Sequence, residues 1–356
     1  MSRVKVLTLF TLLHLASIFA ILPERIISST SEGHWIAILI LFLMELMILW
    51  IYLRSLKPFP GMSIIDICTS SIGVWGSRIV ILPIIIFLSI ELLLLMYFQE
   101  VEIKAVLLQR TPAAATLLLF ITLCFYAAWK GLTVMIRGSI ALSILLMPFI
   151  IFSMLISFKN FRLSYVFPLW VSDWSFWTQP DFYVCIVIFA GFLFLGMSPS
   201  KQQLKFSHTA LTLGIVFVMA IGSVYVPLLV FGQETAVNFQ YPMLMASDTI
   251  DLEWVVFDWL PSFYVVASSA LAVLKVSVLL WMLVAILHQL YIPRLGKVWI
   301  LSAICLGLYV ISLLIPDIQA LDFYLYLNSA FCVYSVIVFP MILFLFSRRL
   351  RKWPNQ

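Results

Sequence analysis

The chain has 356 residues, of which 64% are hydrophobic and only 10% are charged, and its mean hydropathy is +1.13. A soluble globular protein carries roughly 25% charged residues, so this composition cannot cover a water-facing surface. The net charge of +5 is spread over short loops and does not indicate nucleic-acid binding. The apolar runs are long and continuous, which excludes an outer-membrane barrel and predicts an all-α integral membrane protein.

Ten apolar runs are long enough to cross a bilayer, and turn residues such as proline and glycine lie between them. The predicted transmembrane helices occupy residues 6–22, 35–53, 79–98, 113–129, 138–158, 182–197, 210–231, 263–287, 298–315 and 323–346. The first run follows Arg3 and Lys5, as a signal peptide would. Because Pro23, Glu24 and Arg25 stand where a small-x-small cleavage site would be, we expect a retained span.

The loops alternate in their content of Lys and Arg, and this alternation predicts the orientation of the spans. Fifteen basic residues fall on the side of the two termini and five fall on the opposite side. We therefore expect both termini to be cytoplasmic. The longest loop on the outer side, residues 232–260, contains five acidic residues and no Lys or Arg. A solvated face is the first interpretation of this loop, and a docking surface for a partner is the alternative.

Two charged residues lie alone in the middle of apolar runs. Glu91 is the one charge within residues 79–98, and Lys275 is the one charge within residues 263–287. A charge at that depth costs at least about 2.5–3.5 kcal/mol on insertion scales, so each needs a partner, a water-filled cavity or a ligand. The two can pair with each other, or Glu91 can contact a ligand amine and Lys275 a ligand carboxylate. For Glu45, in the second run, we expect a pairing role within the bundle.

Ten spans divide into two sets of five, and an odd number per set gives the halves opposite orientations, as in inverted-repeat transporters. We predict repeats at residues 1–158 and 182–347, an outer connecting loop at 159–181 and a basic cytoplasmic tail at 348–356. The first and sixth spans then correspond. Both are short, and Gly191 and Gly196 favour unwinding of the sixth, so we expect both to be interrupted. A plain bundle with glycine at close helix crossings is the alternative.

Interrupted helices offer free backbone N–H and C=O groups, which suit the carboxylate and ammonium groups of an amino acid. The candidate ligand-binding residues are those at the two expected breaks and on the facing spans, namely His14, Ala16, Ser17, Glu91, Gly191, Phe192, Gly196, Ser268 and Lys275. Seven residues separate Ser268 from Lys275, which places them on one helix face. The alternatives are a hydrogen-bonded core histidine at position 14 and helix packing for the small residues.

Tyr97, near the outer end of the third span, is a candidate gate, with a place in the interfacial aromatic belt as the alternative. The sequence contains no catalytic motif such as GxSxG, HExxH or a P-loop. Its cysteines and histidines are dispersed and do not have the spacing of metal ligands. We therefore expect no enzymatic activity, no metal and no cofactor.

Several segments resemble the B subunits of spore germinant receptors. They are Thr111-Pro112 before the fourth span, Lys130-Gly131-Leu132 through Arg137 after it, Phe231-Gly232-Gln233-Glu234-Thr235-Ala236 followed by Tyr241-Pro242, Leu274-Lys275-Val276-Ser277, and residues 59–78 with Gly73 and Gly76. Their order and spacing extend the resemblance over nearly the whole chain. Thr133 departs from the pattern, because the family usually has an acidic residue there.

The resemblance implies membership of the amino acid–polyamine–organocation transporter superfamily, with its fold of two inverted five-helix repeats. It also implies a place in the inner membrane of bacterial spores, an A subunit and a lipoprotein C subunit as partners, and the sensing of a small nutrient such as an amino acid. One alternative is a proton-coupled amino acid transporter acting alone, with Glu91 or Lys275 as the titrating group. Another is a scaffold that only holds partners or passes water or ions.

Overall fold

The computed structural model describes residues 3–170, 174–197, 204–249, 260–315 and 318–352, without the side chains of 318–320 and 351–352. Within these residues, ten helical segments are long and apolar enough to cross a membrane, which confirms the predicted number. The protein is therefore an all-α, multi-pass membrane protein. Three acids of the predicted outer loop, Asp251, Glu253 and Asp258, lie outside the described residues.

The first half of the chain contains five long helices and three short 3-10 segments. They are α1 (Arg3–Ser29), α2 (His34–Leu56), α3 (Ile64–Val106), α4 (Ala113–Lys130), α5 (Leu132–Ile156), η1 (Ser157–Asn160), η2 (Leu163–Val166) and η3 (Ser175–Thr178). Helix α3 is longer than predicted because Ser63 and Asp66 form a capping box that starts it early. Gly73, with φ 74° and ψ 175°, then kinks it, and this left-handed φ suits glycine.

The second half contains the remaining spans and two short helices in the loop that follows α8. Its elements are α6 (Pro180–Val184), η4 (Cys185–Phe192), α7 (Phe194–Met197), α8 (Phe206–Phe231), α9 (Gln233–Ala236), α10 (Pro242–Asp248), α11 (Leu260–Ile286), η5 (Leu287–Tyr291), α12 (Lys297–Leu314), α13 (Ile318–Val333), η6 (Tyr334–Val338) and α14 (Phe339–Lys352). Helix α14 continues through Arg348 and Arg349, at the start of the predicted tail. The division into two inverted repeats stays a prediction.

The first and sixth spans differ in regularity. The sixth consists of α6, the 3-10 segment η4 and α7, which confirms the predicted interruption of its α-helix. The predicted interruption of the first span is wrong, because α1 is one helix from Arg3 to Ser29 with Pro23 inside it. This span has no glycine, and the side chains of His14 and Ser17 bond the carbonyls four residues before them within the same helix.

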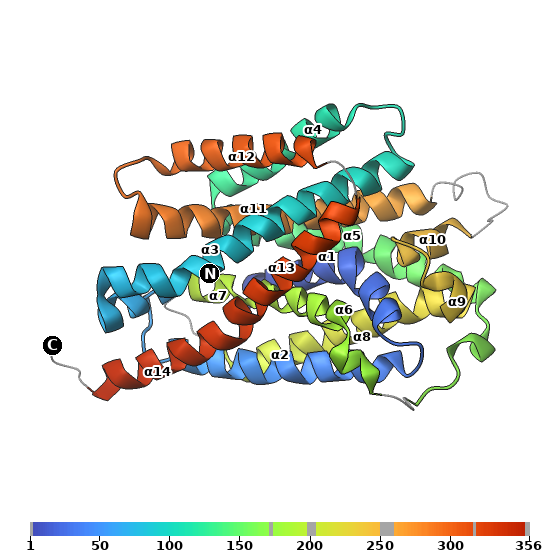
Figure 1. The fold of residues 1–356 in the computed structure, drawn as a ribbon, viewed down its shortest axis with the longest axis horizontal. Helices are drawn as coiled ribbons and strands as arrows, with labels where there is room; N and C mark the ends of the chain where they lie inside the picture. The colour runs from blue at the N-terminus through green and yellow to red at the C-terminus, as the bar shows by residue number, and fades with distance from the viewer. Residues whose placement is uncertain (1–2, 171–173, 198–203, 250–259, 316–317, 353–356) are drawn as a thin grey trace.

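The spans divide into an interior set and a peripheral set. The spans formed by α1, by α6 with η4 and α7, and by α11 are 72%, 78% and 72% buried, whereas those of α4, α5 and α12 are 33%, 22% and 28% buried. Helix α1 contacts α5, α8, α11 and η4, and Figure 1 shows it in the middle of the bundle with α2 and α14 on one side and α4 and α12 on the other. Most residues of the interior spans therefore face protein rather than lipid.

The two ends of the bundle are named here after basic residues that lie at them. At the end called here the Arg78 end, Arg78 lies over the ring of Trp75 at 4.7 Å, and Lys130 lies over the ring of Trp129 at 4.7 Å. Such cation–aromatic pairs are typical of the membrane–water interface. The opposite end is called the Arg25 end, because Arg25 lies there among carboxylates.

Candidate functional site

Lys275 and Glu91 form an ion pair in the interior of the bundle. Nζ of Lys275, on α11, lies 2.6 Å from Oε1 of Glu91, on α3. The two side chains are only 2% and 1% exposed. The sequence analysis allowed these two residues either to pair with each other or to contact a ligand, and the structure shows them paired with each other. The pair joins α11 to α3. Removal of either partner would leave the other charge buried and uncompensated.

Two further polar side chains complete this network and join it to two more helices. Lys275 donates a hydrogen bond of 2.7 Å to Oγ of Ser17 on α1, and Ser17 in turn donates to the carbonyl of Leu13 at 3.3 Å. The amide of Asn328, on α13, donates to Oε2 of Glu91 at 2.8 Å. We call Ser17, Glu91, Lys275 and Asn328 the central network. It connects α1, α3, α11 and α13 through a single buried ion pair.

His14 and Glu45 form a second buried contact, one helical turn from Ser17 along α1. Nε2 of His14 lies 2.6 Å from Oε1 of Glu45 on α2, and both side chains are almost fully buried. Nδ1 of His14 lies 2.7 Å from the carbonyl of Phe10, and because a carbonyl only accepts, Nδ1 must carry a proton. The contact between Nε2 and Oε1 therefore holds one proton, carried by either atom. The pairing role expected of Glu45 is present.

The two glycines of the sixth span give room to side chains of α1 and α2. A Cβ atom at Gly191 would lie 2.7 Å from Cε1 of His14, and one at Gly196 would collide with the hydroxyl of Tyr52. That hydroxyl donates to the carbonyl of Leu193, between η4 and α7, at 2.9 Å. Neither glycine has a positive φ, so it is the close approach of these side chains, and not the backbone conformation, that requires glycine at the two positions.

Three other candidates lie in or near this interior region. Phe192 is fully buried, and its ring packs against Tyr52 with centroids 5.0 Å apart. Ala16 is buried in α1, between His14 and Ser17. Tyr97 is partly buried towards the Arg25 end of α3, with its ring edge-on to that of Phe98 at 6.4 Å.

Ser268 belongs to a different polar group from Lys275. Its hydroxyl donates to Oε1 of Glu102 at 2.9 Å, and the amide of Gln99 donates to Oε2 of Glu102 and to Ser269. Glu102 is eleven residues from Glu91, which is about 16 Å along a helix. The expectation that Ser268 and Lys275 line one cavity therefore finds no support in their hydrogen bonds, since each is bonded within a separate group.

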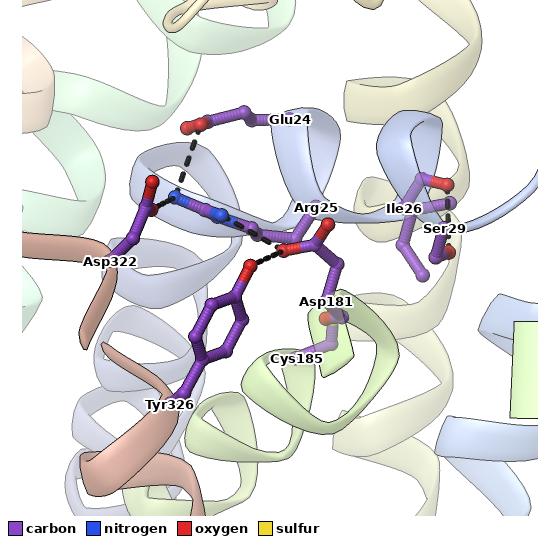
Figure 2. A network of polar contacts seen from close by, with 8 residues as sticks. All are labelled: Glu24, Arg25, Ile26, Ser29, Asp181, Cys185, Asp322 and Tyr326. Carbon is purple, nitrogen blue, oxygen red and sulfur yellow. Dashed lines mark hydrogen bonds and ion pairs between the residues drawn. The ribbon is translucent and has the colours of Figure 1, made fainter. Parts of the chain in front are cut away.

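Arg25 joins three helices at the Arg25 end (Figure 2). Its Nη1 donates to Asp181 on α6 at 2.8 Å, and its Nη2 donates to Asp322 on α13 at 3.1 Å. The same Nη2 lies 3.2 Å from Oε1 of Glu24, the preceding residue of α1. Tyr326 also donates to Asp181, at 3.4 Å. We call this group the Arg25 bridge, because it ties the end of α1 to α6 and α13.

The comparison with family models identifies the chain. A model described as "Spore germination protein" (Spore_permease) matches residues 1–321. The chain belongs to the spore germination protein family. A comparison with curated proteins finds no match. Membership assigns this multi-pass protein a role as a germination-related membrane permease, in a family of permease and receptor-like proteins rather than a class of enzymes.

Some polar residues of this spore germination family member escaped the sequence analysis. Asn328 is the one amide side chain within residues 323–346, and that isolation could have marked it as Glu91 and Lys275 were marked. Asp181 and Asp322 lie beside predicted span ends, where charges are ordinary, so nothing in the sequence distinguishes them as partners of Arg25. The packing of α6 against both α1 and α13 brings that group together.

Proposed function

We propose that this member of the family is the nutrient-binding membrane subunit of a spore germinant receptor and senses a small molecule such as an amino acid. The observation that supports the proposal best is the central network, a buried ion pair held between four spans. A zwitterion carries one group for each charge: its carboxylate can bind Lys275, and its ammonium can bind Glu91. The ligand would thus replace the contact that the two side chains make with each other.

Replacement of the ion pair between Lys275 and Glu91 by contacts with the ligand would change the packing of the spans and so signal that the ligand is bound. When Lys275 and Glu91 bind a ligand instead of each other, α11 and α3 are no longer joined directly, and the spans can adopt a second packing. A ligand shifts such an equilibrium only by its different affinity for the two packings. His14, Gly191, Phe192 and Gly196 lie at the contact of α1 and α2 with the irregular sixth span, where a rearrangement would be transmitted.

In this proposal the protein resides in the inner membrane of the spore and works with a receptor A subunit and a lipoprotein C subunit, which carry the signal onward. Both termini face the cytoplasm, so the Arg78 end is cytoplasmic and the Arg25 end is the outer one. The excess of Lys and Arg in the loops on the side of the termini supports this orientation.

The experiment is a germination dose–response in spores that carry this chain as their sole source of the subunit. The variants Lys275→Ala and Gly191→Leu should raise the nutrient concentration needed for germination at unchanged protein levels. Gly214→Leu is the matched control, because nothing lies within 4 Å of a Cβ atom at Gly214. An unchanged dose–response in both variants would remove the central site.

A proton-coupled amino acid transporter is the second candidate. It is favoured by the single proton held between His14 and Glu45 inside the bundle, next to the irregular sixth span. Proteoliposomes that contain only this chain separate the two functions. Uptake of labelled amino acid that depends on a proton gradient supports the transporter, and binding without uptake supports the receptor.

A further inference from the structure

A small pocket opens at the Arg25 end, beside the Arg25 bridge. It lies between α1, α3, α11 and the beginning of α10, and its enclosed part has room for about one group of the size of a water molecule. Its polar lining consists of two carboxylates (Glu24 and Glu102), two phenols (Tyr241 and Tyr264) and the amide of Gln240. The rest of the lining, in the part of the chain that the structure describes, is apolar and none of it is basic. This combination differs from the central network, where each charge already has an opposite charge, because no described Lys or Arg forms an ion pair with Glu102.

Glu102 is a buried carboxylate whose partners are neutral. It is 8% exposed, and its two oxygens accept hydrogen bonds from Ser268 and Gln99, both at 2.9 Å. No described Lys or Arg lies within ion-pair distance of it. A carboxylate removed from water is costly without an opposite charge, and each carboxylate oxygen has a second lone pair to offer. The geometry therefore suits a cation that arrives from outside the chain.

Tyr264 is a second buried polar residue in the lining of the pocket. Tyr264 is 4% exposed, and its hydroxyl makes no hydrogen bond to any described residue. A buried tyrosine hydroxyl normally has a partner. Tyr241, by contrast, donates to the carbonyl of Phe98 at 3.3 Å, and burial raises the pKa of its hydroxyl well above the ordinary value, so it remains protonated.

The aromatic rings of the wall favour the same kind of ligand. Phe19 and Tyr264 pack edge to face with centroids 6.3 Å apart, and Tyr241 is the third ring of the lining. The negative face of an aromatic ring attracts an organic cation, and the attraction increases when water is excluded. A site lined by carboxylates and aromatic rings binds ammonium groups rather than anions.

The acids near the pocket exceed the basic charge available to them. Figure 2 shows Glu24 approaching the guanidinium of Arg25 from the side away from Tyr326, while Asp181 and Asp322 occupy other positions around it. One guanidinium therefore faces three carboxylates. The carboxylate of Glu24 would attract a second cation, which would compete with Arg25 for it.

We propose that this pocket binds the ammonium group of a small organic amine, with Glu102 at its base, Glu24 at its rim, and Phe19, Tyr241 and Tyr264 around the cation. Eleven residues separate Glu102 from Glu91 and Tyr264 from Lys275, which is about 16 Å on either helix. One small amine cannot reach both sites, so the pocket is a separate first-contact site. The proposal rests on the proposed function only in taking an amine-bearing nutrient as the natural occupant.

The test measures binding of n-propylammonium, with 1-propanol as its neutral analogue, to the purified full chain in nanodiscs. Saturation-transfer NMR should show saturable binding of the amine and none of the alcohol. Glu102→Gln should weaken amine binding at least tenfold. Glu234→Gln, at an exposed acid of α9 outside the pocket, should bind as the unmodified protein does.

Two further variants keep the test decisive if Glu102→Gln does not fold. Tyr264→Phe removes one hydroxyl and keeps the ring, and Glu24→Gln removes the rim charge; each should weaken amine binding several-fold. Equal binding of propylammonium by all three variants, or equal binding of propanol, would overturn the proposal. If the unmodified chain does not bind the amine but Lys275→Ala still impairs germination, the pocket proposal is wrong and the proposed function stands. If the unmodified chain binds the amine but Lys275→Ala germinates normally, the central site is wrong and the pocket proposal stands.

Discussion

The imidazole of His14 occupies the space that a side chain at Gly191 would need. A Cβ atom at Gly191 would lie 2.7 Å from Cε1 and 2.8 Å from Nδ1 of His14, closer than such atoms approach in proteins. The ring cannot turn aside freely, because Nδ1 bonds the carbonyl of Phe10 and Nε2 bonds Glu45. The close packing of the first span against the sixth at this point therefore requires glycine at position 191.

Gly191→Ala should therefore destabilise the protein, because the added methyl group overpacks a fixed ring at a cost of about 1–3 kcal/mol. Thermal unfolding of the purified protein in nanodiscs measures the effect. Gly214→Ala, at an open position of α8, is the control and should unfold at or slightly above the temperature of the unmodified protein. The effect at Gly191 should shrink in a His14→Ala background; an equal loss there would show that His14 is not the obstacle.

The ion pair of Lys275 and Glu91 predicts strongly non-additive variants. Lys275→Met alone should cost about 3–5 kcal/mol, because it leaves the carboxylate of Glu91 buried without its counter-ion. Adding Glu91→Gln should recover most of that loss, since the glutamine carbonyl can still accept from Asn328. The measurement is again thermal unfolding, with Lys297→Met at an exposed lysine as control. Additive losses in the double variant would contradict the coupling.

The contact of His14 with Glu45 predicts a difference between two replacements of the acid. Glu45→Gln should be tolerated, because the glutamine amide can donate a hydrogen bond to Nε2 while Nδ1 stays bonded to Phe10. Glu45→Leu leaves the buried Nε2 without its partner and should cost about 1–3 kcal/mol more. Equal unfolding temperatures for the two variants would argue against a hydrogen bond that matters for stability.

The Arg25 bridge predicts unequal effects of its two aspartates. The side chain of Asp322 is 47% exposed, so Asp322→Asn should change stability by less than about 1 kcal/mol. The side chain of Asp181 is 19% exposed and also accepts from Tyr326, so Asp181→Asn should cost more. Unfolding at low and high salt distinguishes them, because salt screens an exposed pair more than a buried one. The reverse order of the two variants would refute this account.

The sequence alone determined the class of the protein and the residues that need a partner. Long apolar runs specify the membrane and the number of spans, because the hydrocarbon thickness requires about 20 apolar residues for each helix. Isolated charges in such runs stand out for the same reason, since lipid cannot solvate them. Glu91, Lys275 and Glu45 are therefore recognisable from the amino-acid order, and so is the family resemblance that the match over residues 1–321 confirms.

Only the tertiary structure decided which of these groups meet. A spacing of seven residues put Ser268 and Lys275 on one face of α11, yet they bond within separate groups because the partners come from α3 at different depths. Glycine in the sixth span suggested unwinding, but its role depends on His14 and Tyr52, which reach it from other helices. Sequence patterns report the period and length of one helix, whereas the pairing of its polar side chains depends on which helices pack beside it and at what depth.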